Sequence, residues 1–165
     1  MLALRYAYVL ALVIWLGGMV ALGAVVAPAT FQVLQASAPE GGRALAGELF
    51  GVMLSRFHIV AYVAGAVLFI TLAIMAILGP RPSGFAIRMA IISVMLAVAL
   101  YSGLIVLGEI DGIQRAVGAL PSTLATGDPR RLRFDHLHQL STWLMEFNVV
   151  AALALLYWEA REHVR

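Results

Sequence analysis

The sequence predicts an all-α integral-membrane protein, a bundle of four transmembrane helices with a short extramembrane helical cap. Composition is the first reason: the chain has 165 residues, 62% of them hydrophobic and 12% charged, with a mean hydropathy of +0.95. An average soluble domain contains about 25% charged and 45–50% apolar residues. A chain of this length is expected to form one domain, and its core cannot bury so much apolar surface. We therefore expect residues 1–165 to form a single transmembrane domain, with the lipid bilayer as its main partner.

Four apolar segments are the second reason, because each is long enough to cross a bilayer. About 30 Å of hydrocarbon requires roughly 20 apolar residues. We place the spans at residues 6–26, 57–78, 89–108 and 138–158. The first follows Arg5 and exceeds the roughly 7–15 residues of a signal-peptide core, so we interpret it as a retained span. A tight turn, Gly79-Pro80-Arg81-Pro82, joins the second span to the third.

The two longer connections are expected to form the helical cap. Ser37-Ala-Pro39-Glu40 has the spacing of a capping box, which marks the start of a helix. Asp128-Pro129 is a second start signal, because an N-cap residue is followed by proline at the first helical position.

The orientation follows from the number of spans and from the arginines of the tight turn. An even number of spans returns the chain to its starting side. Arg81 and Arg88 border the turn between the second and third spans without an acidic residue, which favours the cytoplasmic side for this turn and for both termini. The expected location is the cell membrane, the inner membrane in a bacterium.

Polar side chains concentrate in the half of the spans that faces the long connections. The second and fourth spans run in the same direction, so residue offsets translate into depth at about 1.5 Å per residue. His58 and His138 enter the membrane at one depth, with Tyr62 and Ser141 one turn deeper and Glu146 about 12 Å below His138. We call this expected group the polar cup, a candidate site for a ligand or a metal. Apart from Thr71 and Ser93, the opposite half of the spans is expected to hold apolar packing.

These polar residues also have simpler interpretations. A histidine at a membrane boundary commonly lies in the headgroup region or bonds another helix. An intramembrane carboxylate costs about 2.5–3.5 kcal/mol and marks a pathway or an internal pair. The simpler interpretation of Glu146 is a protonated acid that bonds Tyr101, Ser102 or Asn148. Two histidines do not complete a tetrahedral metal site, and haem requires the two imidazoles on opposite sides of a gap.

Small residues mark the same half of the first span. They are Gly17, Gly18 and Gly23, followed by Pro28. Small residues let helix backbones approach closely, and they also leave room for a flat ligand. Pro28 is expected where the helix bends or ends.

Several motifs resemble one family of small membrane proteins. They are Trp15-Leu-Gly-Gly18, Ala27-Pro28-Ala29-Thr-Phe31, Arg56-Phe57-His58 and Phe134-Asp-His-Leu-His138-Gln-Leu-Ser141. Together they resemble the transmembrane protein 205-like family, four-span proteins that include a bacterial domain of unknown function. This resemblance implies a four-helix membrane bundle. Because animal members are associated with resistance to platinum drugs, it also hints at metal handling. A weaker similarity to copper-resistance D proteins and to other small membrane proteins with His-ligated haem implies copper or haem as a cofactor.

Three classes of function remain open. The first is a membrane protein whose polar cup binds a metal, haem or another small ligand for transport or redox handling. The second is a non-catalytic accessory subunit that packs against a larger membrane complex or forms a homo-oligomer. The third is an oxidoreductase with haem held by His58 and His138.

The sequence lacks residue types and motifs that other classes of function require. The chain has no cysteine, which excludes disulfides and thiolate chemistry. It also lacks a nucleotide motif, H-E-x-x-H and nucleophile–base spacing, so the sequence leans away from an enzyme. No basic run suggests a nucleic-acid partner.

Overall fold

The computed structural model describes residues 2–39, 41–118 and 121–163, and in these residues the predicted all-α architecture is confirmed: the elements are helices and no strand is present. In chain order they are α1 (Leu2–Ala21), the π-helix η1 (Leu22–Val26), α2 (Ala27–Ser37), α3 (Gly42–Leu78), α4 (Phe85–Leu100), the π-helix η2 (Tyr101–Val106), α5 (Leu107–Val117), the 3-10 helix η3 (Pro121–Thr123) and α6 (Pro129–His163).

Four continuous helices in the described residues are long and apolar enough to cross a membrane. They run over Leu2–Ser37, Gly42–Leu78, Phe85–Val117 and Pro129–Arg161. The first consists of α1, η1 and α2, and the third of α4, η2 and α5. Each predicted span lies within one of them, which indicates a multi-pass membrane protein.

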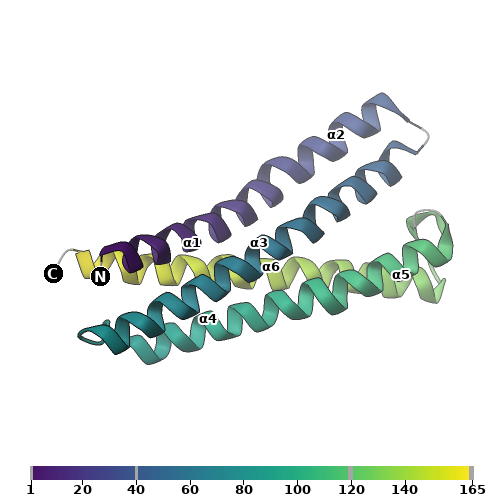
Figure 1. Cartoon of the computed structure of the whole chain (residues 1–165). Helices are drawn as coiled ribbons and strands as arrows, with labels where there is room; N and C mark the ends of the chain where they lie inside the picture. Colours follow the sequence, from purple (N-terminus) through teal and green to yellow (C-terminus); the bar gives the residue numbers. More distant parts are fainter. Residues whose placement is uncertain (1, 40, 119–120, 164–165) are drawn as a thin grey trace.

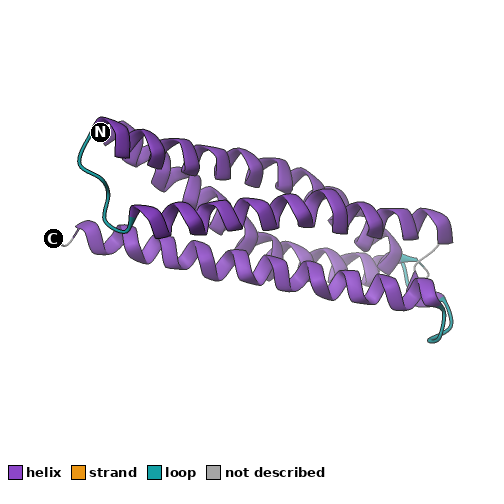
Figure 2. Cartoon of the chain, turned by 90° about the horizontal axis from the view of Figure 1, so that it is seen from below, coloured by secondary structure: helices purple, strands orange, loops and turns teal. Residues whose placement is uncertain are grey.

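The helices form a bundle that is closed at one end and splayed at the other. Near the termini, α1 packs on α3 and α6, and α4 packs on the same two helices. Toward the other end, α2 stays with α3 and α5 stays with α6, and the tips of these two hairpins lie apart (Figure 1). The view from below shows the termini and the α3–α4 turn together at the closed end (Figure 2).

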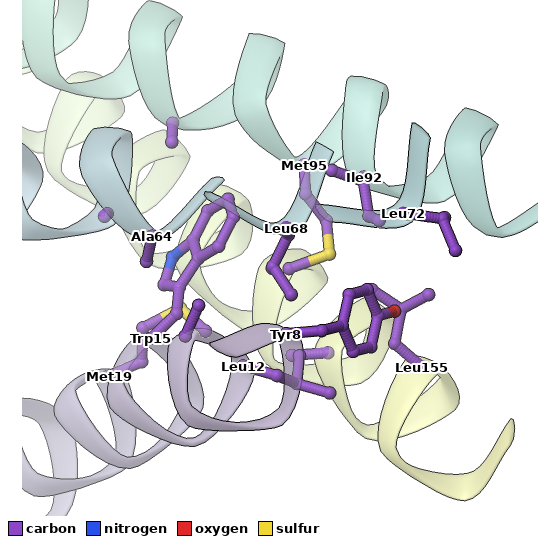
Figure 3. Close-up of a cluster of buried hydrophobic side chains, with 14 residues drawn as sticks. Tyr8, Leu12, Trp15, Met19, Ala64, Leu68, Leu72, Ile92, Met95 and Leu155 are labelled. Carbon is purple, nitrogen blue, oxygen red and sulfur yellow. The ribbon is translucent and has the colours of Figure 1, made fainter. Parts of the chain in front are cut away.

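The main buried core fills the closed half of the bundle. It brings together Tyr8, Leu12 and Trp15 from α1 with residues of α3, α4 and α6, as Figure 3 shows for Leu68, Met95 and Leu155. A smaller core of Val106, Ile110 and Leu137 joins the third continuous helix to α6. Many large apolar side chains outside these cores are exposed, as expected for surfaces that face lipid.

The closed end also contains buried charges, each one residue outside a predicted span. Arg88 is 1% exposed and Glu159 4% exposed. The Glu159 carboxylate pairs with Arg88 Nη2 at 2.7 Å and with Arg5 Nε at 2.5 Å, and the Arg88 guanidinium lies 4.9 Å from the centre of the Tyr8 ring. Arg5, Arg88 and Glu159 come from the ends of three different spans, which meet at one depth. Pairing and the aromatic face compensate for the lost hydration of these charges.

The cap consists of the ends of the spanning helices rather than of separate helices. Ser37 is the last residue of α2, so the capping box predicted to start there is wrong; Glu40 lies outside the described residues. The next helix, α3, follows Gly41, whose φ of 101° is in the left-handed region that glycine tolerates best. The start predicted at Asp128-Pro129 is confirmed, because the Arg130 N–H donates to Asp128 Oδ1 at 2.8 Å.

Pro28 does not end the first continuous helix. Immediately before α2, the backbone widens into η1, and the Ala27 N–H bonds to the Leu22 carbonyl five residues earlier. Proline lacks the N–H that an α-helix would use here and crowds the preceding turn. The wider π-turn gives room for the ring, and the helix continues to Ser37.

Candidate ligand-binding cavity

A cavity of about 440 Å³ lies between the two hairpins. All four continuous helices line it, and both π-helices contribute a residue, Gly23 from η1 and Ser102 from η2. Its apolar walls include Trp15, Met19, Phe57, Ala61, Leu107 and Met145, while Arg43, Asp111 and Asp135 stand on the helix segments nearest the hairpin tips. Pockets for small molecules commonly occupy about 300–1,000 Å³, so this cavity has the size of a ligand site.

Both predicted histidines line this cavity, in different surroundings. His58 is half-buried, and its Nδ1 lies 2.9 Å from the Leu54 carbonyl oxygen. Because a carbonyl only accepts, Nδ1 carries the hydrogen, and Nε2 of the neutral ring is an acceptor. His138 is exposed, and its ring stacks on Phe134 with 6.1 Å between centroids and 8° between planes. The two histidines therefore share a cavity, and only His58 has its ring held by the backbone.

Of the other residues in the predicted polar cup, Ser141 lines the cavity and Tyr62 does not. Ser141 lines the cavity beside Thr142, whose hydroxyl donates to the His138 carbonyl at 3.1 Å. The Tyr62 side chain is not part of the cavity wall. Its hydroxyl lies 3.5 Å from the Ala99 carbonyl and its ring centroid 6.0 Å from that of His58, so Tyr62 neighbours His58 without lining the cavity.

Glu146 lies on the outside of the bundle, and the predicted bond to Tyr101, Ser102 or Asn148 is wrong. Its side chain is exposed, does not line the cavity and makes no hydrogen bond within the described part of the chain. Helix geometry explains this position, because each residue turns the chain by about 100°. Two residues, or a rotation of about 200°, separate Glu146 from the buried, cavity-lining Asn148, so these two side chains point to nearly opposite sides of α6.

Asn148 is the cavity residue whose role the sequence analysis missed, since it was considered only as a partner of Glu146. It is 4% exposed, lines the cavity, and its Oδ1 is buried without a hydrogen-bond partner among the described residues. The signal was present in the spacing: Ser141, Met145 and Asn148 are four and three residues apart, which places them on one helix face.

The small residues of the first continuous helix behave differently from one another. A Cβ at Gly18 would clash with the Phe57 ring, so this glycine lets α1 approach α3. Gly23 lines the cavity, where a Cβ would lie 3.3 Å from Met145 Cε. A Cβ at Gly17 meets open space, and Pro28 is exposed, so neither mediates packing inside the chain.

Comparison with known proteins places the chain in a family. A family profile described as "Domain of unknown function (DUF4149)" matches residues 10–116, more than half of the chain. The chain belongs to this family. In this DUF4149 member the match extends from α1 into α5; it includes His58 and Ser102 and ends before α6, which carries His138 and Asn148. The match is consistent with the expected small membrane domain of unknown function and does not confirm the more specific transmembrane protein 205-like family.

The other two comparisons give no relative for the DUF4149 chain: no curated protein and no solved structure matches it.

The donor set of the DUF4149 cavity is poor for a metal ion. Among the described residues, no group of three or more His, Cys, Asp or Glu side chains is arranged to hold one. His58 and His138 alone do not complete a tetrahedral site. The lining is suited to a molecule with a large apolar surface and a few polar groups.

Proposed function

We propose that this protein binds a small, largely apolar molecule in the cavity between its two hairpins. The cavity of about 440 Å³ carries this proposal. Apolar walls with a few placed polar groups are typical of small-molecule sites, and here His58, Ser102, Ser141 and Asn148 supply the polar groups. Binding inside the bilayer would serve transport or redox handling of the bound molecule.

An organic ligand is favoured over copper or haem, which the sequence resemblance implied. Copper would need donors beyond His58 and His138, and the described residues offer no suitable group of three. Haem held by both histidines would require two well-positioned imidazoles, whereas His138 is exposed and stacked on Phe134. We therefore assign no redox step to a metal or to haem.

Two glycines allow a matched test of this proposal. A Cβ at either Gly51 or Gly17 meets open space, but only Gly51 lines the cavity. The probe is 2-naphthol, measured by equilibrium dialysis against nanodiscs that contain the protein, with empty nanodiscs as the blank for lipid partition. We expect saturable binding to wild type and to Gly17→Phe, and none to Gly51→Phe. Equal binding to all three proteins, or to none, would contradict the proposal.

A second candidate function, an accessory subunit or homo-oligomer, is favoured by the position of Glu146. This exposed carboxyl stands beside Trp143, Phe147 and Val150, which are also exposed. A carboxyl on the lipid-facing side of a span is costly, and a partner helix with a hydrogen-bond donor would remove that cost. Native mass spectrometry from mild detergent tests this candidate: a complex that is present in wild type and lost in Glu146→Leu supports it, and a monomer in both cases contradicts it.

We also place the protein in the cell membrane with both termini on the cytoplasmic side. The arginines of the tight turn at the closed end support this orientation.

A further inference from the structure

The part of the Asn148 amide that a ligand can reach is a hydrogen-bond donor. Asn148 is 4% exposed and lines the cavity. Its Oδ1 is enclosed by the protein, so a molecule in the cavity meets the Nδ2 amino group, which donates and does not accept. Neither polar atom of this amide has a hydrogen-bond partner among the residues that the structure describes. Because buried polar groups almost always have a partner, this open donor calls for an acceptor from outside the chain.

Ser102 adds a second unused polar group from a neighbouring helix. It lies in η2, which contacts α6. Ser102 is 7% exposed, lines the same cavity and makes no hydrogen bond within the described part of the chain. Its hydroxyl can donate or accept. Two side chains that are more than nine-tenths buried, on two adjoining helices, therefore leave hydrogen-bonding groups open to one cavity, and both of these groups can donate.

The charged side chains of the cavity wall stand far from Asn148, which indicates a neutral acceptor. Arg43, Asp111 and Asp135 line the cavity on the helix segments nearest the hairpin tips. From Asp135 to Asn148, α6 advances by about 20 Å. An ionised acceptor beside Asn148 would lose its hydration without gaining a nearby counter-charge, and burial of an unpaired charge is costly. A neutral oxygen fits this position better than a carboxylate or a phosphate.

The depth of Asn148 points to a molecule other than the phospholipids of the bilayer. Asn148 stands in the middle of the predicted span 138–158, about 15 Å along the helix from His138. The hydrocarbon layer is about 30 Å thick, and the polar parts of phospholipids lie at its two boundaries. Their ester oxygens are therefore about 15 Å from this amide. The acceptor belongs to a separate molecule that enters the cavity.

We infer that the cavity selects a largely apolar molecule bearing a neutral accepting oxygen, as in a ketone, a quinone or an ester, to which the Asn148 N–H donates. This inference rests on the proposed function and specifies the chemical class of its ligand. The apolar body of the molecule lies against Trp15, Phe57 and Met145, which line the cavity. A hydrocarbon of the same shape leaves the N–H without a partner and binds less tightly. A donor elsewhere on the ligand is neither required nor excluded.

Two probes of nearly the same shape test the inference. They are 2-acetylnaphthalene and 2-isopropenylnaphthalene, in which a CH2 group replaces the carbonyl oxygen. Equilibrium dialysis against protein in nanodiscs, with empty nanodiscs as the partition blank, gives an affinity for each probe. Because one hydrogen bond changes an affinity by roughly two- to tenfold, we expect wild type to prefer the ketone by about that factor.

Variants of Asn148 assign this preference to its amide. Asn148→Leu and Asn148→Ala both remove the donor, and each should lose most of the preference for the ketone. Thr142→Val is the matched control, because Thr142 also lines the cavity but already donates to the His138 carbonyl. It should keep the preference. Asn148→Leu should unfold at the same temperature as wild type or higher, since it replaces an unpartnered amide by an apolar group, and Asn148→Ala guards against a packing defect of the larger side chain.

The outcomes separate this inference from the proposed function. Equal affinities of wild type for the two probes, with both probes blocked by Gly51→Phe, would overturn the inference and leave the cavity as a binding site. A preference that persists undiminished in both Asn148 variants would also overturn it. Binding that is absent in wild type or unaffected by Gly51→Phe would overturn the inference and the proposed function together.

Discussion

Arg88 on α4 and Glu159 on α6 form a buried ion pair, with 2.7 Å between Nη2 and Oε2, at the closed end of the bundle. Arg5 on α1 pairs with the same carboxylate. Three of the four continuous helices are therefore joined at one point, while the two hairpins diverge at the opposite end, where the cavity lies.

Removing one partner of the buried pair should strongly destabilise the protein. Arg88→Met leaves the Glu159 carboxylate buried without one of its cations, and losses of this kind cost about 3–5 kcal/mol. Thermal unfolding in detergent should therefore occur at a clearly lower temperature. Arg133→Met is the control, because the Arg133–Glu109 pair is exposed, and exposed pairs contribute about 0–1 kcal/mol. Similar stabilities of both variants would show that the pair at the closed end does not hold the helices together.

Gly103 should be intolerant of even one extra methyl group. A Cβ at this position would clash with the His58 ring and the Tyr62 hydroxyl, and overpacking of this kind costs about 1–3 kcal/mol. We expect Gly103→Ala to lower the unfolding temperature and to weaken 2-naphthol binding by displacing His58. Gly108→Ala, where the added Cβ meets open space, should be neutral or stabilising because alanine favours helix. If Gly103→Ala behaves like Gly108→Ala, His58 is not held in the described position.

The start of α6 should depend on Asp128 and on pH. Hydrogen bonds from Arg130, first from its side chain and then from its backbone N–H, lower the pKa of the Asp128 carboxyl. The pKa of Asp128 is therefore lower in the folded state than in the unfolded state. At a pH above the unfolded-state pKa, the ionised carboxylate contributes fully to the stability of the helix start. This contribution is lost as the pH falls through the folded-state pKa. Amide hydrogen exchange in the first turn of α6 should therefore be faster in Asp128→Ala than in wild type, and Asp128→Asn should retain the cap. Equal exchange rates in all three proteins would contradict a role of Asp128 as the N-cap.

The orientation can be tested by labelling, because the chain has no cysteine of its own. Ser83→Cys lies in the turn at the closed end, and Thr126→Cys lies in the loop before α6; both side chains are exposed. A membrane-impermeant maleimide added to intact cells should label Thr126→Cys only, and Ser83→Cys should react after the cells are opened. Labelling of both from the same side would contradict the four-span topology, and the reverse pattern would contradict only the cytoplasmic placement of the termini.

Much of the architecture could be predicted from the sequence, because it depends on distance along the chain. A helix rises by a fixed amount per residue, so the apolar segments predict the spans and their depths. This depth argument led to the half of the bundle in which His58, His138 and Ser141 line one cavity. Applied to the other ends of the spans, it would also have placed Arg5, Arg88 and Glu159 at a common depth. Asp128-Pro129 was predictable for a local reason, since an N-cap needs only its own helix.

Tertiary structure alone decided which way each side chain faces. Glu146 and Asn148 are two residues apart, yet one lies outside the bundle and the other is buried and lines the cavity, because two residues rotate the chain by about 200° around the helix axis. Which of these directions points into the bundle depends on how the whole helix is turned toward its neighbours, and packing determines that. The π-helices η1 and η2 shift the phase further, since their wider turns hold more residues than an α-helical turn. Depth is thus a property of the single helix and can be read from the sequence, whereas orientation about the helix axis is settled only when the four helices pack.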